Sequence, residues 1–442
     1  MNLDRLIRGA LLLLAIAIPA TAQPQGAPPT SARYIDPTNG LSLEDAIATA
    51  LKQEPSLRAA RMDVDAALAR RQQAALRANP TATFERRDEP GGSDSQTTVM
   101  VELPLELFRR GARTTTAERE IDISRHDVAD RERRLTAEVR ARYGDVLVAV
   151  RELAVLDELV SSVERQRDLV GARVKEGATP RLERDLLEVD VRRLAADRRL
   201  QVGRVDAAVA ELNRVLGRPP GTALTIREML ETVVHRESQD QMARLADAAA
   251  AVRSRPDILA AEARIRGADA RIAQAAADGR VDVSLFGSYM RMGAGFPQTG
   301  FGPGGGLERV RGVFNYIAAG AMVTVPVFDR NQGGVAAARA EREGAARERD
   351  AAVLRAQTEI ATAAIEDASA RDAVAHYREG AQRLARQNLD VVTQTFELGR
   401  ATVFDVLAEH RRYLDIEKSF TAALRAAFDA RSRLQLALGE QR

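Results

Sequence analysis

Val-Glu-Leu-Pro-Leu at residues 101–105 recurs as Val-Thr-Val-Pro-Val at residues 323–327, and a glycine follows each copy, at Gly111 and at Gly333. Each copy ends a stretch in which apolar and polar residues alternate, which is typical of a β-strand with one apolar face. A long segment with helical periodicity follows both copies. The junction between a strand and a long helix is therefore present twice, and this duplication decides the fold.

A second pair of matching segments gives the same spacing. Val-Lys-Glu-Gly at residues 174–177 recurs as Phe-Glu-Leu-Gly at residues 396–399, and these copies are as far apart as the two strands that contain proline. Glu-Pro-Ser-Leu-Arg-Ala-Ala at residues 54–60 recurs at a shorter spacing, as Arg-Pro-Asp-Ile-Leu-Ala-Ala at residues 255–261. The second half therefore carries an insertion between its first helix and its proline-containing strand.

We predict two repeats, over residues 41–216 and 256–440, joined by a connector over residues 217–255. Each repeat has, in order, a helix, a β-hairpin, a very long helix, a glycine turn and a return helix. The hairpins are predicted over 81–107 and 281–327, the turns near 175–182 and 397–404, the main helices over 42–78, 113–174, 180–216, 331–395 and 402–438, and a short connector helix near 226–234. A rise of 1.5 Å per residue makes each long helix about 90 Å long.

The amino terminus has the features of an export signal. Arg5 and Arg8 precede an apolar run over residues 10–18, and small residues follow, so residues 1–22 are predicted to be a signal peptide. The alternative, a membrane anchor, requires about 20 apolar residues. We expect residues 23–40 to be an extended leader of the mature chain.

The composition is typical of thin helical walls. Aromatic residues make up 4% of the chain, there is no Trp, and 65 basic residues nearly balance 63 acidic residues. Aromatic side chains normally supply much of the buried area of a large core, so a large globular core is not expected. Because no region carries charge of a single sign, nucleic-acid binding is not expected.

Several classes of chemistry have no support in the residue types present. The chain has no Cys, which excludes disulfides, thiolate catalysis and an amino-terminal lipid anchor on Cys. Asp372 and His376 are four residues apart, as metal ligands can be, but no third ligand joins them and we interpret them as a solvated helix face. No nucleophile, base and orienting group form a set, so we expect no enzyme activity, no cofactor and no metal site.

The predicted strands indicate a membrane barrel shared between chains. Strands over residues 81–87, 97–105, 281–289 and 317–327 alternate with a period of two, and their lengths approach the roughly 9–11 residues that cross a bilayer at a tilt. Four strands cannot close, and an open sheet in hydrocarbon leaves edge amides without partners. Three copies would supply twelve strands around a water-filled lumen. The alternative is a pair of water-soluble hairpins on a periplasmic protein.

Several motifs resemble the TolC superfamily of outer membrane efflux proteins. They are Leu-Ser-Leu-Glu-Asp-Ala at 41–46, Val-Pro-Val-Phe-Asp-Arg-Asn-Gln-Gly at 325–333 and the carboxy-terminal turn Phe-Glu-Leu-Gly-Arg-Ala-Thr-Val-Phe-Asp-Val-Leu-Ala-Glu at 396–409. The chain is most similar to the CzcC-type branch, the outer membrane component of cobalt, zinc and cadmium efflux systems. It departs from that branch at Phe-Arg-Arg-Gly, residues 108–111, where close relatives tend to have Gly-Gly-Lys-Arg.

The resemblance implies a fold that is mainly α with β. It implies a homotrimer with a twelve-stranded barrel in outer membrane lipid and a periplasmic α-barrel about 100 Å long. It further implies docking onto a periplasmic adaptor, or membrane fusion protein, fed by an inner membrane resistance-nodulation-division (RND) pump that exports heavy-metal cations. Alternatives are a duct for multidrug efflux or for type I secretion, or, in a different class, a periplasmic coiled-coil adaptor without a barrel.

The resemblance also assigns roles at the periplasmic tips. The residues implied in adaptor contacts are Gly177, Ala178, Thr179, Gly399, Arg400, Ala401 and Thr402. A family aspartate at the tip constriction corresponds to Asp405, and Glu183 occupies the equivalent position of the first repeat, so a trimer would carry six carboxylates around a narrow aperture. The alternative is that both are ordinary acids in the first turn of a helix. The family's second tip acid is replaced by Ala408.

Overall fold

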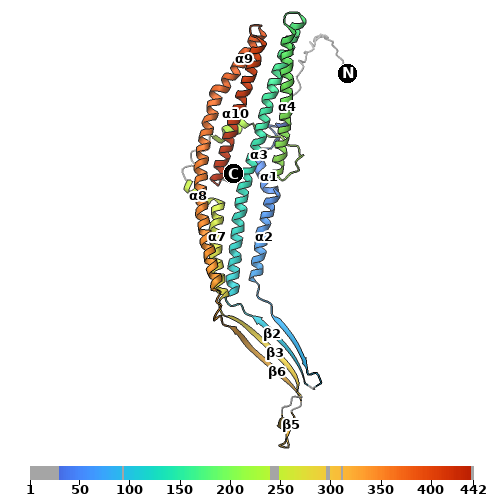
Figure 1. Cartoon of the computed structure of the whole chain (residues 1–442), viewed down its shortest axis with the longest axis vertical. Coiled ribbons are helices and arrows are strands. Elements are labelled where there is room, and N and C mark those ends of the chain that lie inside the picture. Colours follow the sequence, from blue (N-terminus) through green and yellow to red (C-terminus); the bar gives the residue numbers. More distant parts are fainter. Residues whose placement is uncertain (1–28, 92–93, 239–247, 295–298, 310–311, 440–442) are drawn as a thin grey trace, which may run out of the picture.

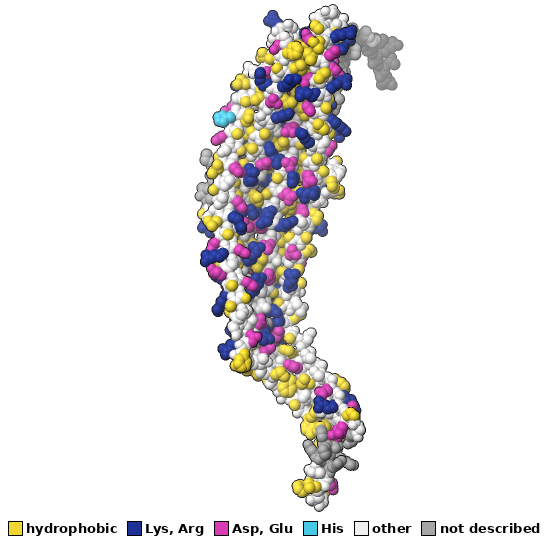
Figure 2. Space-filling model, in the orientation of Figure 1, with side chains coloured by type: hydrophobic (Ala, Val, Ile, Leu, Met, Phe, Trp, Pro, Cys, Tyr) yellow, Lys and Arg dark blue, Asp and Glu magenta, His cyan; other side chains and the backbone are white. Residues whose placement is uncertain are grey.

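The computed structural model describes residues 29–91, 94–238, 248–294, 299–309 and 312–439. The molecule is long and narrow, with bundled helices over most of its length and a β-sheet at one end (Figure 1). Basic and acidic side chains intermingle over the helical region (Figure 2). The predicted signal peptide, residues 1–22, lies outside the described residues.

The first repeat contains the predicted elements with one additional break. Its elements are α1 (Leu43–Gln53), α2 (Pro55–Ala75), β1 (Thr81–Asp88), β2 (Ser95–Pro104), α3 (Arg109–Lys175) and α4 (Arg181–Val215). The single helix predicted over residues 42–78 is wrong, because Pro55 has no N–H to continue a helix and instead begins a new one. The Glu54 carboxylate caps that new helix by accepting a hydrogen bond from the Leu57 N–H at 2.6 Å.

The connector and the leader pack against each other. Ile226, predicted to be helical, forms parallel bridges with Ile35 and Leu41 instead, and α5 begins only at Leu230 (Leu230–Ser238), followed by α6 (Ala248–Ser254). The described part of the leader is not extended throughout, since it begins with a 3₁₀ helix (Thr30–Tyr34). These contacts fix the connector to the first repeat.

The second repeat has the predicted order, with two features that the sequence pattern did not predict. Its elements are α7 (Pro256–Asp278), β3 (Asp282–Ala294), β4 (Thr299–Phe301), β5 (Leu307–Arg309), β6 (Gly312–Thr324), α8 (Gln332–His376), a π-helix (Tyr377–Gln382), α9 (Arg383–Glu397) and α10 (Val403–Ala437). The π-helix interrupts the single helix predicted over residues 331–395. The predicted insertion corresponds to the longer strands of this hairpin and to the small β4–β5 hairpin at its end (Figure 1).

The two long hairpins form one antiparallel sheet in the order β1-β2-β3-β6. Register places Phe84, Val99, Tyr289 and Ile317 side by side, which confirms the predicted apolar face. We call this the outer face of the sheet, and it is solvent-exposed in the single chain: Ile317 is 87% exposed. Within the described residues, β1 and β6 each pair on one side only, so the sheet has two open edges.

The helical core consists of a narrow seam. Valines of α3, including Val139, Val146 and Val163, are fully buried against neighbouring helices. The buried apolar residues form three separate clusters along the length of the molecule, two of which include valines of α3. No helix within the described ranges combines the length and the apolarity needed to cross a bilayer.

Candidate functional site: the helical tips and the mid-length network

The two turns at the far end of the helices have the same backbone geometry. We call residues 176–180 the first tip and residues 398–402 the second tip. Gly177 has a φ of +73° and Gly399 a φ of +75°, a conformation that strains any residue with a Cβ. In each turn the glycine N–H bonds the carbonyl three residues back, at 3.1 and 2.9 Å, and the next N–H bonds the carbonyl five residues back, at 2.9 Å in both.

The return helices begin differently at the two tips. The Thr402 hydroxyl accepts from the Asp405 N–H at 3.2 Å, and the Asp405 carboxylate accepts from the Thr402 N–H at 2.9 Å, which completes a capping box. The Thr402 hydroxyl also lies 2.7 Å from the Asp405 carboxylate and donates to it, and this bond together with the one from the Thr402 N–H holds the pKa of Asp405 below its ordinary value. At the first tip Pro180 occupies the cap position and α4 has no side-chain cap. Asp405 therefore has a structural role in addition to any role in the aperture.

The residues predicted to contact an adaptor are all at least partly exposed. Gly177, Ala178, Gly399, Arg400 and Thr402 are exposed, and the other two are partly exposed. The sequence pattern missed three apolar side chains at the same end of the molecule, Leu182, Leu398 and Phe404, which are 65%, 72% and 64% exposed. The signal was available, because Leu182 and Phe404 have the same spacing as the two tip glycines and so occupy equivalent positions.

Arg173 links the helix ends beside the two tips. Arg173, in the last turn of α3, donates to the Phe396 carbonyl at 3.4 Å and to the Glu397 carbonyl at 2.5 Å. The Phe396 ring is buried, and the Arg173 guanidinium lies 5.9 Å from its centroid. A cation at the carboxyl end of a helix is stabilised by the orphan carbonyls there. A side chain of the first repeat therefore binds the carboxyl end of α9 in the second repeat.

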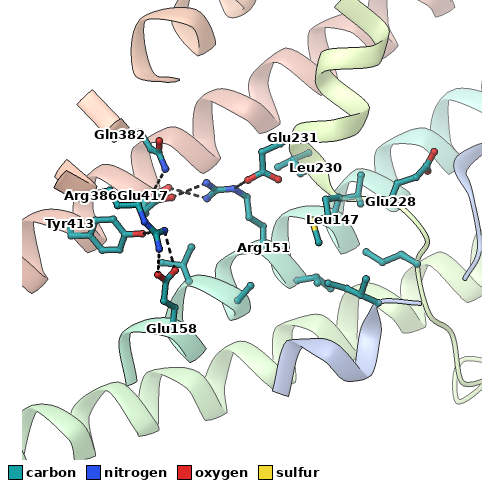
Figure 3. Close-up of a pocket in the computed structure, with 16 residues that line it drawn as sticks. Leu147, Arg151, Glu158, Glu228, Leu230, Glu231, Gln382, Arg386, Tyr413 and Glu417 are labelled. Carbon is teal, nitrogen blue, oxygen red and sulfur yellow. Dashed lines mark hydrogen bonds and ion pairs between the residues drawn. The ribbon is translucent and has the colours of Figure 1, made fainter. Parts of the chain in front are cut away.

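A cluster of charged and polar side chains lies within the helical region, away from the tips, and most of its members are drawn in Figure 3. We call Arg151, Glu231, Gln382, Glu417 and Thr421 the mid-length network. Arg151 of α3 donates to Glu231 of α5, to the Thr421 hydroxyl of α10 and, at 2.8 Å, to the Glu417 carboxylate of α10. Gln382, at the end of the π-helix, donates to the other Glu417 oxygen at 2.9 Å. The network ties three helices and the connector together.

Burial makes this network different from the surface ion pairs. The side chains of Arg151 and Glu417 are 10% and 3% exposed, and they border a cavity of about 260 Å³. Burial lowers the pKa of Arg151, but its ion pairs with Glu231 and Glu417 outweigh that effect and leave the pKa above its ordinary value. The nearby pair of Arg386 with Glu158 is half exposed by comparison.

One buried histidine lies between the two return helices. His410 of α10 is 1% exposed, and neither of its ring nitrogens has a hydrogen-bond partner among the described residues. Burial lowers its pKa to about 4, against an opposing charge from Asp190 of α4. The imidazole is therefore neutral at physiological pH.

Asp372 and His376 are both exposed on α8. Across the ranges that the structure describes, no three side chains among His, Cys, Asp and Glu come together as a metal site would require.

Comparison with known proteins supports the architecture. A model of the family described as Outer membrane efflux protein matches residues 46–218 and 248–440. Outer membrane protein OprJ of Pseudomonas aeruginosa is 26% identical over 443 residues, which cover 95% of this chain and 87% of OprJ.

Two solved structures share the fold. The structure of CusC has a TM-score of 0.69 at 16% identity, covering 90% of this chain and 92% of that one. The structure of VceC from Vibrio cholerae has a TM-score of 0.65 at 17% identity, covering 90% of this chain and 96% of that one. The predicted TolC-like fold and the outer membrane location are confirmed. The two repeats, the four-stranded sheet that they form together and the family match over most of the sequence agree: this chain belongs to the Outer membrane efflux protein family, whose members are conduits and not enzymes.

Proposed function

We propose that the chain forms a homotrimeric channel of a tripartite efflux system. An inner membrane RND pump would deliver substrate through a periplasmic adaptor, and the channel would conduct it passively across the outer membrane. The observation that carries this proposal is the sheet with an apolar outer face and two open edges, β1 and β6. In hydrocarbon those edges need partners, and the edge strands of further copies supply them.

The stoichiometry is tested by native mass spectrometry of the full chain in detergent. We expect a mass of three chains, because twelve strands enclose a lumen and four do not. A monomeric mass, with ion conductance absent in planar bilayers, would overturn the trimeric channel.

The tips are the proposed adaptor surface. Their support is the exposure of the glycine turns together with that of Leu182, Leu398 and Phe404, which present apolar area at an end of the molecule that is otherwise rich in charge. Changing Leu182 and Phe404 together to Ser should weaken co-purification of the adaptor while the trimer mass stays the same. A matched change on the helix face, Leu354→Ser, where Leu354 is 65% exposed, should have no effect.

Heavy-metal cations such as cobalt, zinc and cadmium are the proposed substrates. The support is the resemblance to the CzcC-type branch and the pair of tip acids, Asp405 and Glu183, which would place six carboxylates around the aperture of a trimer. Deleting the gene should sensitise cells to these metals. Sensitivity to a detergent panel alone would contradict the metal assignment and favour a multidrug duct.

The acidic ring has its own test. Asp405→Asn keeps a side-chain oxygen that can accept from the Thr402 N–H, so the cap survives while the charge is removed. Combined with Glu183→Gln, it should reduce the cation preference of single channels. If the cation preference is unchanged, both residues act only as acids in the first turn of their helices, and the ring has no role in selectivity.

A further inference from the structure

An open groove of about 570 Å³ lies where the strands β2, β3 and β6 meet the helices, at the bend of the molecule (Figure 1). Val283 places the groove on the outer face of the sheet, because it lies six residues before Tyr289 in the same strand. The apolar residues that line the groove are Leu107, Phe108, Val281, Val283, Val325 and Pro326. The apolar outer face therefore continues to the point where the helices begin.

Two arginines border this groove. Arg280 follows α7 and Arg330 precedes α8, and both side chains are exposed. Gly279 brings the two segments into contact, because a Cβ at this position would lie 2.0 Å from the Arg330 carbonyl oxygen. The two guanidiniums therefore belong to adjoining stretches of main chain at the rim of one groove.

These two arginines differ from others at the junction. Carboxylates pair with Arg109 (Asp282, 2.9 Å) and with Arg113 (Glu106, 2.8 Å). Among the residues that the structure describes, neither Arg280 nor Arg330 has such a partner. The Arg280 guanidinium lies over the Phe108 ring, 5.2 Å from its centroid, and Arg330 uses its Nε to donate to the Pro326 carbonyl at 3.3 Å. The Nη nitrogens of both side chains are left to bind another group.

Two further acids at the junction act on other residues. Asp329 accepts a hydrogen bond from the Asn331 N–H at 2.9 Å, next to the start of α8. Asp278 is close enough to Arg113 to stabilise its positive charge. The rim of the groove therefore presents two guanidiniums that no carboxylate of the described chain binds.

This combination fits one class of ligand. Guanidinium groups bind phosphate oxygens through paired N–H donors, and the apolar stem of an arginine can lie along an apolar surface while its charged end reaches a polar layer. Phe328, two residues before Arg330, is 92% exposed, and exposed aromatic side chains are typical of the boundary between a membrane and water. A molecule with a phosphate beside a long apolar chain would use both the rim and the lining.

We propose that the groove bordered by Arg280 and Arg330 binds an anionic phospholipid, with its phosphate on the two guanidiniums and an acyl chain along the apolar lining. The proposal rests on the trimeric channel proposed above, because only a closed barrel places the outer face of the sheet in lipid. In that channel the helices extend into the periplasm, so the groove lies at the headgroups of the periplasmic leaflet.

The test uses native mass spectrometry of the full chain, purified in detergent and titrated with phosphatidylglycerol. Up to three bound lipids per trimer are expected. Phosphatidylethanolamine with the same acyl chains should bind more weakly, because its ammonium group offsets the phosphate charge. Arg280→Gln combined with Arg330→Gln should weaken phosphatidylglycerol binding about thirtyfold, from roughly fivefold for each basic residue at an anionic surface.

The matched control removes the same charge elsewhere. Arg378 in the π-helix and Arg411 in α10 are exposed and lie away from the sheet. Arg378→Gln combined with Arg411→Gln should bind phosphatidylglycerol like the wild type. Inorganic phosphate at the same concentration should not displace the lipid, because it has no chain for the groove, and displacement would contradict a lipid site.

The comparison of headgroups keeps the site testable if the double variant fails to fold. Equal binding of the two lipids by the wild type, or unchanged phosphatidylglycerol binding in a folded double variant, would overturn the site. Native mass and ion conductance are recorded on the same samples. A conducting trimer without a headgroup preference refutes this site alone, whereas a monomeric mass without conductance refutes the channel.

Discussion

The two repeats have the same order of elements but differ at mid-length. In the first, α3 runs without interruption for 67 residues, whereas the second divides the corresponding length among α8, a π-helix and α9. The residue of the second repeat that corresponds to the buried Val160 is Gln382, which ends the π-helix and bonds Glu417. The ends of the elements match between the repeats, but at this position the first repeat buries a valine while the second has a glutamine that donates to Glu417. Irregular helical turns of this kind often mark functional positions.

The largest expected effect on the mid-length difference between the repeats comes from replacing Arg151, the central residue of the mid-length network. Arg151→Met should lower the free energy of unfolding by about 3–5 kcal/mol, because it leaves the buried Glu417 carboxylate without its cationic partner. Chemical denaturation of the purified chain measures the effect. Arg386→Met, which removes a half-exposed pair with Glu158, should cost less than about 1 kcal/mol. If both changes lower the free energy of unfolding equally, burial gives the mid-length network no greater effect on stability than a half-exposed ion pair.

The return helices offer a comparison that depends on pH. His410 of α10 is buried, whereas its counterpart Glu188 is partly exposed and pairs with Arg192. Because the pKa of His410 is lowered to about 4 in the folded protein, the unfolded chain takes up a proton more readily. Stability should therefore fall as pH drops from about 6.5 toward 4, by up to roughly 3 kcal/mol.

The pH effect has a matched pair of variants. His410→Leu should flatten this part of the stability profile, and His376→Leu, at an exposed position, should leave it unchanged. The hypothesis fails if the profile keeps its slope without His410.

At the tips the two repeats should respond alike to the same substitution. Gly177→Ala and Gly399→Ala each force a side chain into a positive-φ conformation and should each cost about 1–2 kcal/mol. Gly111→Ala, on a helix with open space around the Cβ position, should raise stability by about 0.5–1 kcal/mol. A cost at only one tip, measured by denaturation, would show that the turns are not equivalent.

The smallest expected change in stability distinguishes the first turn of α10, which has a side-chain cap, from that of α4, which has none. Thr402→Ala removes a side-chain cap and should cost about 1 kcal/mol, while Thr402→Ser should restore it. Thr179→Ala, beside the uncapped Pro180, should change little. A thermal melt that ranks Thr179→Ala as the more damaging change would contradict the capping difference.

Features that repeat along the sequence could be predicted from it, whereas local irregularities and contacts between distant residues could not. The two-residue alternation around Val99 and Tyr289 gave the correct strand faces, and the glycine turns and return helices began where their end signals are. The break at Pro55 was missed although proline carries a known signal. The π-helix was missed because its hydrogen-bond shift has no counterpart in composition. The partners of Arg151 could not be predicted, because they lie 80 and 266 residues away along the chain.

The open edges of the sheet have a consequence for how the molecule comes into being. If β1 and β6 pair with the edge strands of further copies, as proposed, the rate of barrel closure depends on how many copies are present at the membrane. Until closure, β1 and β6 present unpaired amides that template aggregation as readily as assembly. The helices, by contrast, already bury an apolar seam within one chain, so this part of the packing does not depend on other copies. The helices of each chain would therefore pack before the barrel closes.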